Sequence, residues 1–110
     1  MYNKSTLVDA LSVTLKQKKF HDLSRSDIRT AVDLILSRIG EAVAEGDRVE
    51  IRGFGVFSHN DLPGRHGRNP RTGEPVIVPP KRAIHFKPGL DLRHEVDRLA
   101  KVQNEGYGYP

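Results

Sequence analysis

The chain has 110 residues and a formal net charge of +4, and this length accommodates a single domain. It contains no run of about eighteen apolar residues that could cross a bilayer, and its first residues lack the apolar segment of a secretory signal. The absence of cysteine excludes a disulfide framework and a thiolate metal site. We therefore expect a cytoplasmic protein.

The excess positive charge lies in the middle third of the sequence. Residues 48–89 contain eight Lys or Arg and three Asp or Glu, whereas the rest of the chain contains ten and eleven. Six of the eight cations are arginines, whose planar guanidinium suits contacts with phosphates and bases. Clustered basic charge of this kind indicates a polyanion binder.

The first predicted element is a helix with one apolar face. Asn3 can cap a helix that begins at Lys4. Leu7, Leu11 and Leu15 recur every four residues, so they lie on the same side of that helix.

A second, longer helix is predicted to follow a short connector. Ser24 and Asp27 have the spacing of a capping box, and the pattern continues to Glu45, with Gly46 as the stop signal. The apolar stripe is wider than one packing partner requires. Its members are Ile28, Ala31, Val32, Leu34, Ile35, Leu36, Ile39, Ala42 and Val43. We infer burial from two sides, one of them a second subunit.

The next stretch is predicted to begin as a strand, with Val49 and Ile51 on one face and Glu50 and Arg52 on the other. A Gly-Phe-Gly sequence then breaks the alternation, which is typical of a bulge or of close backbone approach. The aromatic residues predicted to lie in the core of this region are Phe54, Phe57 and Phe86.

Residues 62–80 are predicted to form the tip and return of a hairpin arm, spanning about residues 59–84. Eight of these nineteen residues are Gly or Pro, too many for a central strand. A short helix is predicted to start near Leu90, and residues 101–110 are predicted to be a disordered tail.

The arm is centred on the sequence from Arg65 to Gly73, in which three arginines alternate with glycines and a proline. No large apolar residue occurs from Gly64 to Pro75, so this run has nothing to bury in a core. We expect a projecting, positively charged loop that the rest of the chain positions.

Three ordered motifs resemble the HU/integration host factor family of bacterial histone-like DNA-binding proteins. They are Val49-Glu50-Ile51-Arg52-Gly53-Phe54-Gly55-Val56-Phe57, Gly67-Arg68-Asn69-Pro70-Arg71-Thr72-Gly73 and His85-Phe86-Lys87-Pro88-Gly89-Leu90-Asp91-Leu92-Arg93. The first and third look most similar to the integration host factor beta subunit. The resemblance covers residues 3–100, and we assign residues 1–100 to the domain.

The resemblance implies an α+β fold: two N-terminal helices, an antiparallel sheet with a long protruding β-hairpin arm, and a short C-terminal helix. It also implies an intertwined homodimer or heterodimer that binds double-stranded DNA. Paired arms enter the minor groove and bend the duplex, as architectural members of this class do. Nucleoid association, DNA condensation, and support of recombination and transcription follow from the same resemblance.

The resemblance also implies site residues. Pro70 matches the family's intercalating proline, although Asn-Pro pairs in general shape turns. The arm residues implied to contact DNA are Arg65, Gly67, Arg68, Asn69, Arg71 and Gly73. Those on the body are Lys4, Ser5, Glu50, Arg52, Lys81, Arg82, Lys87, Pro88 and Gly89.

Several of these assignments have specified roles. Arg52 is implied to enter the minor groove with Glu50 orienting it, the alternative being an exposed cross-strand pair. Lys81, Arg82 and Lys87 are assigned to phosphates. Gly67 and Gly73 are expected to permit a positive φ and a close approach of the backbone to DNA.

The chain also departs from the family pattern. Residues 7–23 look about one helical turn longer than usual. At the base of the arm, Asp61 stands in a segment that often carries an arginine, and its charge is expected to repel DNA.

The sequence is also compatible with other classes of function. Within the family, non-specific compaction of the HU kind is the alternative to a site-preferring protein. A basic-arm adaptor for RNA or protein is another possibility. An enzyme is not expected, nor is a metal or cofactor, because no histidine stands at a recognised ligand spacing or in a nucleophile motif. The histidines are His21, His59, His66, His85 and His94.

Overall fold

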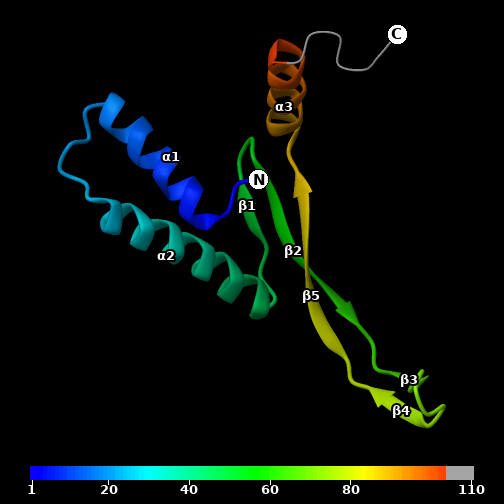
Figure 1. Ribbon diagram of the computed structural model, residues 1–110. Helices are drawn as coiled ribbons and strands as arrows, with labels where there is room; N and C mark the ends of the chain where they lie inside the picture. Colours follow the sequence, from blue (N-terminus) through cyan, green and yellow to red (C-terminus); the bar gives the residue numbers. More distant parts are fainter. Residues whose placement is uncertain (104–110) are drawn as a thin grey trace. The chain divides into compact units, whose positions relative to one another are not determined.

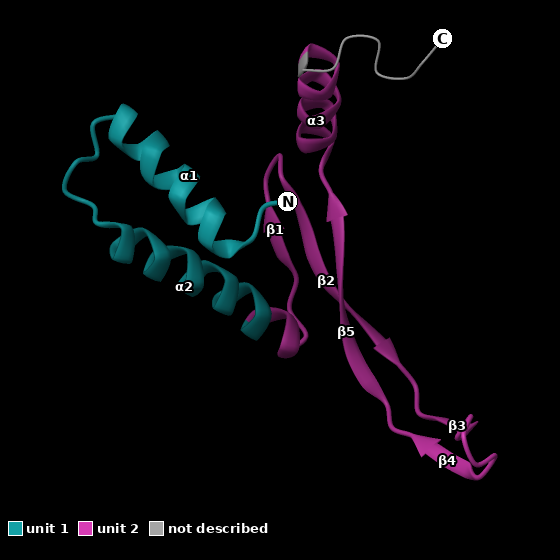
Figure 2. Cartoon of the chain, in the orientation of Figure 1, with its two compact units in different colours: residues 1–41 teal, residues 42–110 magenta. Residues whose placement is uncertain are grey.

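The computed structural model describes residues 1–103 of the chain (Figure 1). Its elements, in order, are α1 (Lys4–Gln17), α2 (Arg25–Ala44), β1 (Val49–Ile51), β2 (Gly55–Leu62), β3 (Arg65–Arg68), β4 (Pro75–Val78), β5 (Lys81–Pro88) and α3 (Leu90–Gln103). Two compact units, residues 1–41 and 42–110, are distinguished by colour in Figure 2. Within the described residues, no helix is long and apolar enough to cross a membrane.

Helix α1 begins with the predicted cap. The Oδ1 atom of Asn3 accepts a hydrogen bond from the Thr6 N–H at 2.9 Å, and the Asn3 N–H donates to Thr6 Oγ1 at 2.8 Å. These reciprocal bonds satisfy amide groups that have no partner within the helix. The helix ends at Gln17, and Lys19 follows with a φ of 69°.

Both predicted ends of α2 are confirmed to within one residue. The N–H of Ser24 donates to Asp27 Oδ2, and the N–H of Asp27 donates to Ser24 Oγ, both at 3.0 Å. The backbone bond from Ser24 also lowers the pKa of the Asp27 carboxyl. The helix ends at Ala44, and Gly46 turns the chain with a φ of 94°.

Few apolar side chains are buried within the single chain. Among the described residues, the buried hydrophobic side chains are Val8, Ile28 and Val43. By contrast, Leu34 and Ile35 on α2 are 60% and 59% exposed. The second face of α2, expected to lie against another subunit, is therefore open in the isolated chain.

Strands β1, β2 and β5 form an antiparallel sheet in the order β1-β2-β5. The predicted bulge is wrong, because the Gly-Phe-Gly sequence contributes to a tight turn between two paired strands. In that turn the Phe54 N–H donates to the Ile51 carbonyl at 2.9 Å, and Gly53 has a φ of 81°. The predicted close approach is confirmed at Gly55, where a Cβ atom would lie 2.5 Å from the ring of Phe86.

The predicted aromatic cluster forms on this sheet. The ring of Phe57 lies 4.6 Å from that of Phe86 and 6.5 Å from that of Phe54, measured between centroids. Phe54 is nevertheless 42% exposed in the single chain, so the cluster is only partly covered.

The hairpin that carries the arm consists of two successive two-stranded ladders. Strands β2 and β5 pair as far as Leu62 and Lys81, and β3 and β4 form a separate ladder beyond them (Figure 1). Prolines stand at the break on both sides, at Pro63 and Pro79-Pro80. Because proline has no N–H to donate, the ladder is interrupted there.

Helix α3 is tied to the turn between β1 and β2. The Gly89 N–H donates to the Phe54 carbonyl at 2.8 Å, and the Leu92 N–H donates to the Gly53 carbonyl at 3.0 Å. With 14 residues the helix is longer than expected and includes residues 101–103, which the sequence assigned to the tail. The rest of that predicted tail, residues 104–110, lies outside the described residues.

Candidate nucleic-acid interface

The tip of the arm is a closed loop between β3 and β4. The Asn69 N–H donates to the Glu74 carbonyl at 2.9 Å, and the Gly73 N–H donates to the Asn69 carbonyl at 2.7 Å. Inside the loop, Asn69 Oδ1 accepts a hydrogen bond from the Arg71 N–H at 2.9 Å. These bonds fix the backbone on both sides of Pro70, whose side chain is exposed.

The three arginines of the arm differ in their surroundings. Arg68 Nη1 donates to the Gly73 carbonyl at 3.0 Å, so this side chain helps to close the loop. The side chains of Arg65 and Arg71 are exposed, and within residues 1–103 neither forms a side-chain hydrogen bond or an ion pair. Two cations per arm are therefore directly available to an anion.

The two loop glycines play different parts. Gly73 has a φ of 72°, the left-handed conformation that was expected. The same expectation is wrong for Gly67, which lies in the regular strand β3 opposite Val76. A Cβ atom there would make only ordinary contacts, 3.5 Å from Val78 Cγ2 and 3.7 Å from Val76 Cγ2.

The predicted site residues on α1 already have partners within residues 1–41. Lys4 Nζ lies 2.8 Å from Asp33 Oδ1, and the hydrogen bond from this lysine is the main reason that the pKa of Asp33 is lowered. Ser5 Oγ accepts a hydrogen bond from Arg25 Nη2 at 3.0 Å. Both pairs are exposed to solvent, so phosphate contacts would compete with weak surface interactions.

The predicted pair of Glu50 and Arg52 is not joined by a side-chain contact in the free chain. Glu50 is an exposed residue of β1, whereas Arg52 lies in the turn before β2. Among the described residues no ion pair links their side chains. The turn separates Arg52 from the ladder, so the alternative of an exposed cross-strand pair does not form, and the role of Arg52 in the minor groove stays a prediction.

Arg82 is held by the protein itself. Its Nε and Nη2 atoms donate to the two carboxylate oxygens of Asp61 at 2.8 and 3.1 Å, and its Nη1 atom donates to the Ala44 carbonyl at 3.0 Å. The bonds between the two side chains are the leading cause of the lowered pKa of Asp61 and the raised pKa of Arg82. The phosphate contact expected of Arg82 is therefore not available in this conformation, and Asp61 is not an unpaired negative charge.

A basic groove lies on the sheet beside the start of α3. Its volume is about 660 Å³, and its lining brings together three cations, Arg48, Lys87 and Arg93. The predicted residues Pro88 and Gly89 also line it, as do Val56, Ser58, His85 and Leu90. Arg48 and Arg93 were not identified as site residues from the sequence. Only the pairing of β1, β2 and β5 brings the segments before β1 and after β5 together.

A metal centre is not evident in the part of the chain that the structure describes. Within residues 1–103, no group of three or more His, Asp or Glu side chains is arranged to hold a metal ion. Among those residues, the His59 ring contacts a single carboxylate, that of Asp61, with its Nδ1 atom 3.0 Å from Oδ1.

Comparison with known proteins gives a consistent result. The sequence model of a family described as bacterial DNA-binding protein matches residues 2–97. Over 102 residues the chain is 46% identical to an integration host factor subunit beta from Ralstonia nicotianae, covering 93% of this chain and 70% of that protein. A second such subunit, from Halorhodospira halophila, is 47% identical over 94 residues, which are 86% of this chain and 87% of that protein.

Solved structures agree with the sequence relatives. An HU protein from Anabaena, crystallised with DNA, has a TM-score of 0.69 at 33% identity and covers 86% of this chain and 97% of its own. The solution structure of a mutant of transcription factor 1 has a TM-score of 0.58 at 26% identity, covering 93% of this chain and 97% of its own.

Proposed function

The chain belongs to the bacterial DNA-binding protein family of HU and integration host factor, and from that premise we propose that it binds and bends double-stranded DNA as an architectural protein. The arms enter the minor groove, and the exposed ring of Pro70 wedges between stacked bases. Unstacking costs a few kcal/mol per step and is offset by the contacts that a bent duplex makes with more protein surface.

The observation that carries this function is the loop around Pro70. A wedge must keep its shape while it is pushed into a base stack, so the chain on either side of it must be fixed. The side-chain oxygen of Asn69 accepts a hydrogen bond from the Arg71 N–H at 2.9 Å, and its backbone carbonyl accepts one from the Gly73 N–H at 2.7 Å. Pro70 adds its own fixed φ, and the exposed Arg71 provides a cation beside the wedge for a phosphate.

Electrostatic contacts extend from the arm to the body. We propose that Arg65, Arg68 and Arg71 bind along the minor groove and its phosphates. We further propose that Arg48, Lys87 and Arg93 hold a flanking phosphate in the groove that they line. Each neutralised phosphate releases counterions, so binding must weaken as salt rises.

Arg52, Lys81 and the first turns of α1 and α3 complete the proposed interface. Lys81 is exposed at the start of β5, where the first arm segment ends. The amide groups at Lys4, Ser5 and Leu90 can donate to phosphates in the way that helix N-termini do, whereas the Gly89 N–H is already bonded to the Phe54 carbonyl.

The protein acts as a dimer, as its family does. Leu34, Ile35 and Leu36 are 60%, 59% and 55% exposed in the isolated chain. A domain with only three buried hydrophobic side chains in its described part is only marginally stable alone. A second copy or a related subunit covers this face and contributes the second arm.

We propose a nucleoid-associated role in the bacterial cytoplasm, without catalysis. By bending DNA, the protein brings distant sites together and so supports recombination and transcription. The sequence relatives are integration host factor subunits, which favours a preference for deformable sites over uniform coating.

The test is a bending assay on a duplex labelled with a fluorophore pair at its ends. Pro70→Ala should reduce the bend of the duplex more than it reduces the affinity for DNA. Pro70→Leu keeps an apolar wedge and should retain more of the bend than the alanine variant. If the two variants bend DNA equally, Pro70 acts by shaping the turn. If DNA stays straight with the native protein, or if the protein prefers RNA, the proposed function is wrong.

A further inference from the structure

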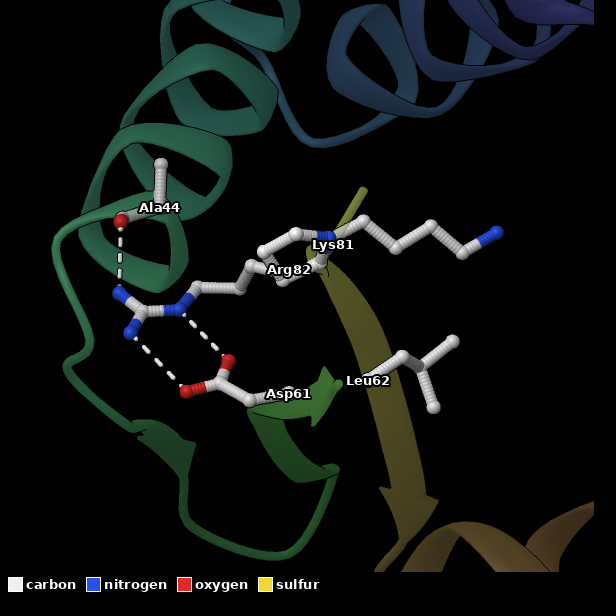
Figure 3. Close-up of a pocket in the computed structure, with 6 residues that line it drawn as sticks. Ala44, Asp61, Leu62, Lys81 and Arg82 are labelled. Carbon is white, nitrogen blue, oxygen red and sulfur yellow. Dashed lines mark hydrogen bonds and ion pairs between the residues drawn. The ribbon is translucent and has the colours of Figure 1, made fainter. Parts of the chain in front are cut away.

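A cluster of polar side chains at the base of the arm is not explained by contact with DNA. Figure 3 shows Arg82 reaching from β5 to the carboxylate of Asp61 on β2 and to the carbonyl of Ala44 at the end of α2. The ring of His59, two residues before Asp61, contacts the same carboxylate at 3.0 Å. All of these residues belong to the unit of residues 42–110.

The geometry of Arg82 uses every nitrogen of its guanidinium. Nε and Nη2 form a bidentate pair with Asp61 at 2.8 and 3.1 Å, and Nη1 is 3.0 Å from the Ala44 carbonyl oxygen. Paired bonds of this kind fix the orientation of both groups as well as attracting them. Lysine could not reproduce the arrangement, because its single ammonium lacks the planar fork.

The Ala44 carbonyl is a favourable partner for a cation. It is the last residue of α2, where carbonyls lack partners within the helix and the helix dipole is negative. The chain then turns at Gly46, where a Cβ atom would lie 3.3 Å from Arg82 Nη1. The guanidinium therefore lies against both the last turn of α2 and the turn that follows it.

The cluster lies at the end of the β2–β5 ladder, next to the break in strand pairing. Asp61 and Arg82 face each other in the ladder of β2 and β5, and only the pair Leu62 and Lys81 lies beyond them. The prolines at the break then interrupt the pairing. A ladder end next to such a break opens more readily than the middle of a ladder, so side-chain contacts there help to hold the arm in place.

We propose that Arg82 is a positioning residue that clamps the base of the arm to the last turn of α2, and that Asp61 orients its guanidinium. This inference rests on the proposed function, because positioning the arm matters only if the arm acts on DNA. Asp61 then aids binding despite its negative charge.

The competing explanation makes the opposite prediction. If Asp61 merely occupied an arginine that is meant for a phosphate, neutralising Asp61 would release Arg82 and strengthen DNA binding. If Arg82 is a clamp, neutralising Asp61 loosens the arm and weakens binding. The direction of the effect of Asp61→Asn therefore separates the two.

The first experiment measures the arm without DNA. The chain has no cysteine, so Ile77→Cys, at a side chain that is 78% exposed on β4, gives a single spin-labelling site. Asp61→Asn, Arg82→Gln and Arg82→Lys should each increase the mobility of the label, with circular dichroism verifying that the variants fold. Unchanged mobility in all three folded variants would overturn the proposal.

The second experiment measures DNA binding by the same variants. Asp61→Asn and Arg82→Gln should each weaken binding by roughly two- to fivefold, the size expected for an exposed ion pair, and the double variant should be no weaker than either. Glu74→Gln is the control, since it removes an arm carboxylate outside the cluster and should strengthen binding. If Asp61→Asn strengthens binding as the control does, or if Arg82→Lys retains full affinity, Arg82 is a phosphate contact and the clamp is refuted.

The two experiments fail independently. If the native protein does not bend DNA, the proposed function is wrong, whereas the label mobility still decides whether Arg82 and Asp61 restrain the arm.

Discussion

Asn69 and Arg71 are joined across Pro70 by a hydrogen bond of 2.9 Å from the Arg71 N–H to the Asn69 side-chain oxygen. This bond makes the two neighbours of the proline a rigid frame. The backbone N–H of Asn69 helps to close the loop, because it donates to the Glu74 carbonyl at 2.9 Å. The tip of the arm is therefore shaped before DNA is present, and the consequences can be measured.

Asn69→Ala should loosen the tip and reduce bending. The substitution removes the acceptor for the Arg71 N–H while leaving the backbone bonds of Asn69 possible. Hydrogen exchange without DNA should show faster exchange of the Arg71 amide, and the end-to-end transfer assay should show a smaller bend. Thr72→Ala is a matched control, since Thr72 Oγ1 accepts only a longer bond of 3.3 Å from the Glu74 N–H. Equal effects of the two variants would contradict the proposed frame.

Arg71→Ala should reduce the salt dependence of DNA binding without the loss of bending that Arg68→Ala should also cause. Removing one phosphate-binding cation should reduce the magnitude of the slope of log K against log salt by about 0.9. Because Arg71 has no side-chain partner within residues 1–103, its truncation disturbs no bond inside the arm. Arg68→Ala also removes the bond to the Gly73 carbonyl and should reduce bending as well. An unchanged slope for Arg71→Ala would show that this side chain points away from DNA.

The pair of Asp61 and Arg82 should persist to lower pH than an ordinary carboxylate would allow. The hydrogen bonds from Arg82 lower the pKa of Asp61 in the folded state, relative to about 3.9 for an unperturbed Asp. The stabilisation is therefore fully present above the unperturbed value and is lost as the pH falls through the lowered one. An NMR titration of the Asp61 carboxyl should show this, and Arg82→Gln should move the pKa back up. If the titration midpoint of Asp61 is the same in the native protein and in Arg82→Gln, the pairing is contradicted.

Gly55→Ala should destabilise the protein severely. Its Cβ atom would lie 2.5 Å from two atoms of the Phe86 ring and 2.7 Å from the Lys87 carbonyl oxygen, and the backbone cannot yield without disturbing the ladder of β2 and β5. Overpacking of this kind typically costs about 1–3 kcal/mol, which thermal unfolding would reveal. Gly67→Ala is the control, because its Cβ would make only ordinary contacts; similar melting points for both variants would refute the close packing at Gly55.

Leu36→Lys should disrupt the dimer. This side chain is 55% exposed in the single chain, and a charge placed in an apolar interface carries a large desolvation cost. Sedimentation at micromolar concentration should show monomers or unfolded chains for the variant and dimers for the native protein. Arg38→Ala, at an exposed ion pair on the same helix, should leave assembly intact. A native protein that sediments as a folded monomer would contradict the dimer.

The local order of the chain was determined by its sequence alone. Caps at Asn3 and Ser24, the stop at Gly46 and the abundance of Gly and Pro in the arm act over a few residues, so the pattern suffices to predict them. The family motifs likewise pointed to the loop around Pro70, because those residues are contiguous.

Only the tertiary structure decided which cations are open to solvent and which are held by the protein. The sequence predicts the same phosphate contact for Arg82 as for Lys81. The register of β2 and β5, however, places Arg82 opposite Asp61 and beside the end of α2. The basic groove depends in the same way on segments that lie far apart in the chain. Pairings between distant residues depend on register and backbone direction, which no local pattern specifies.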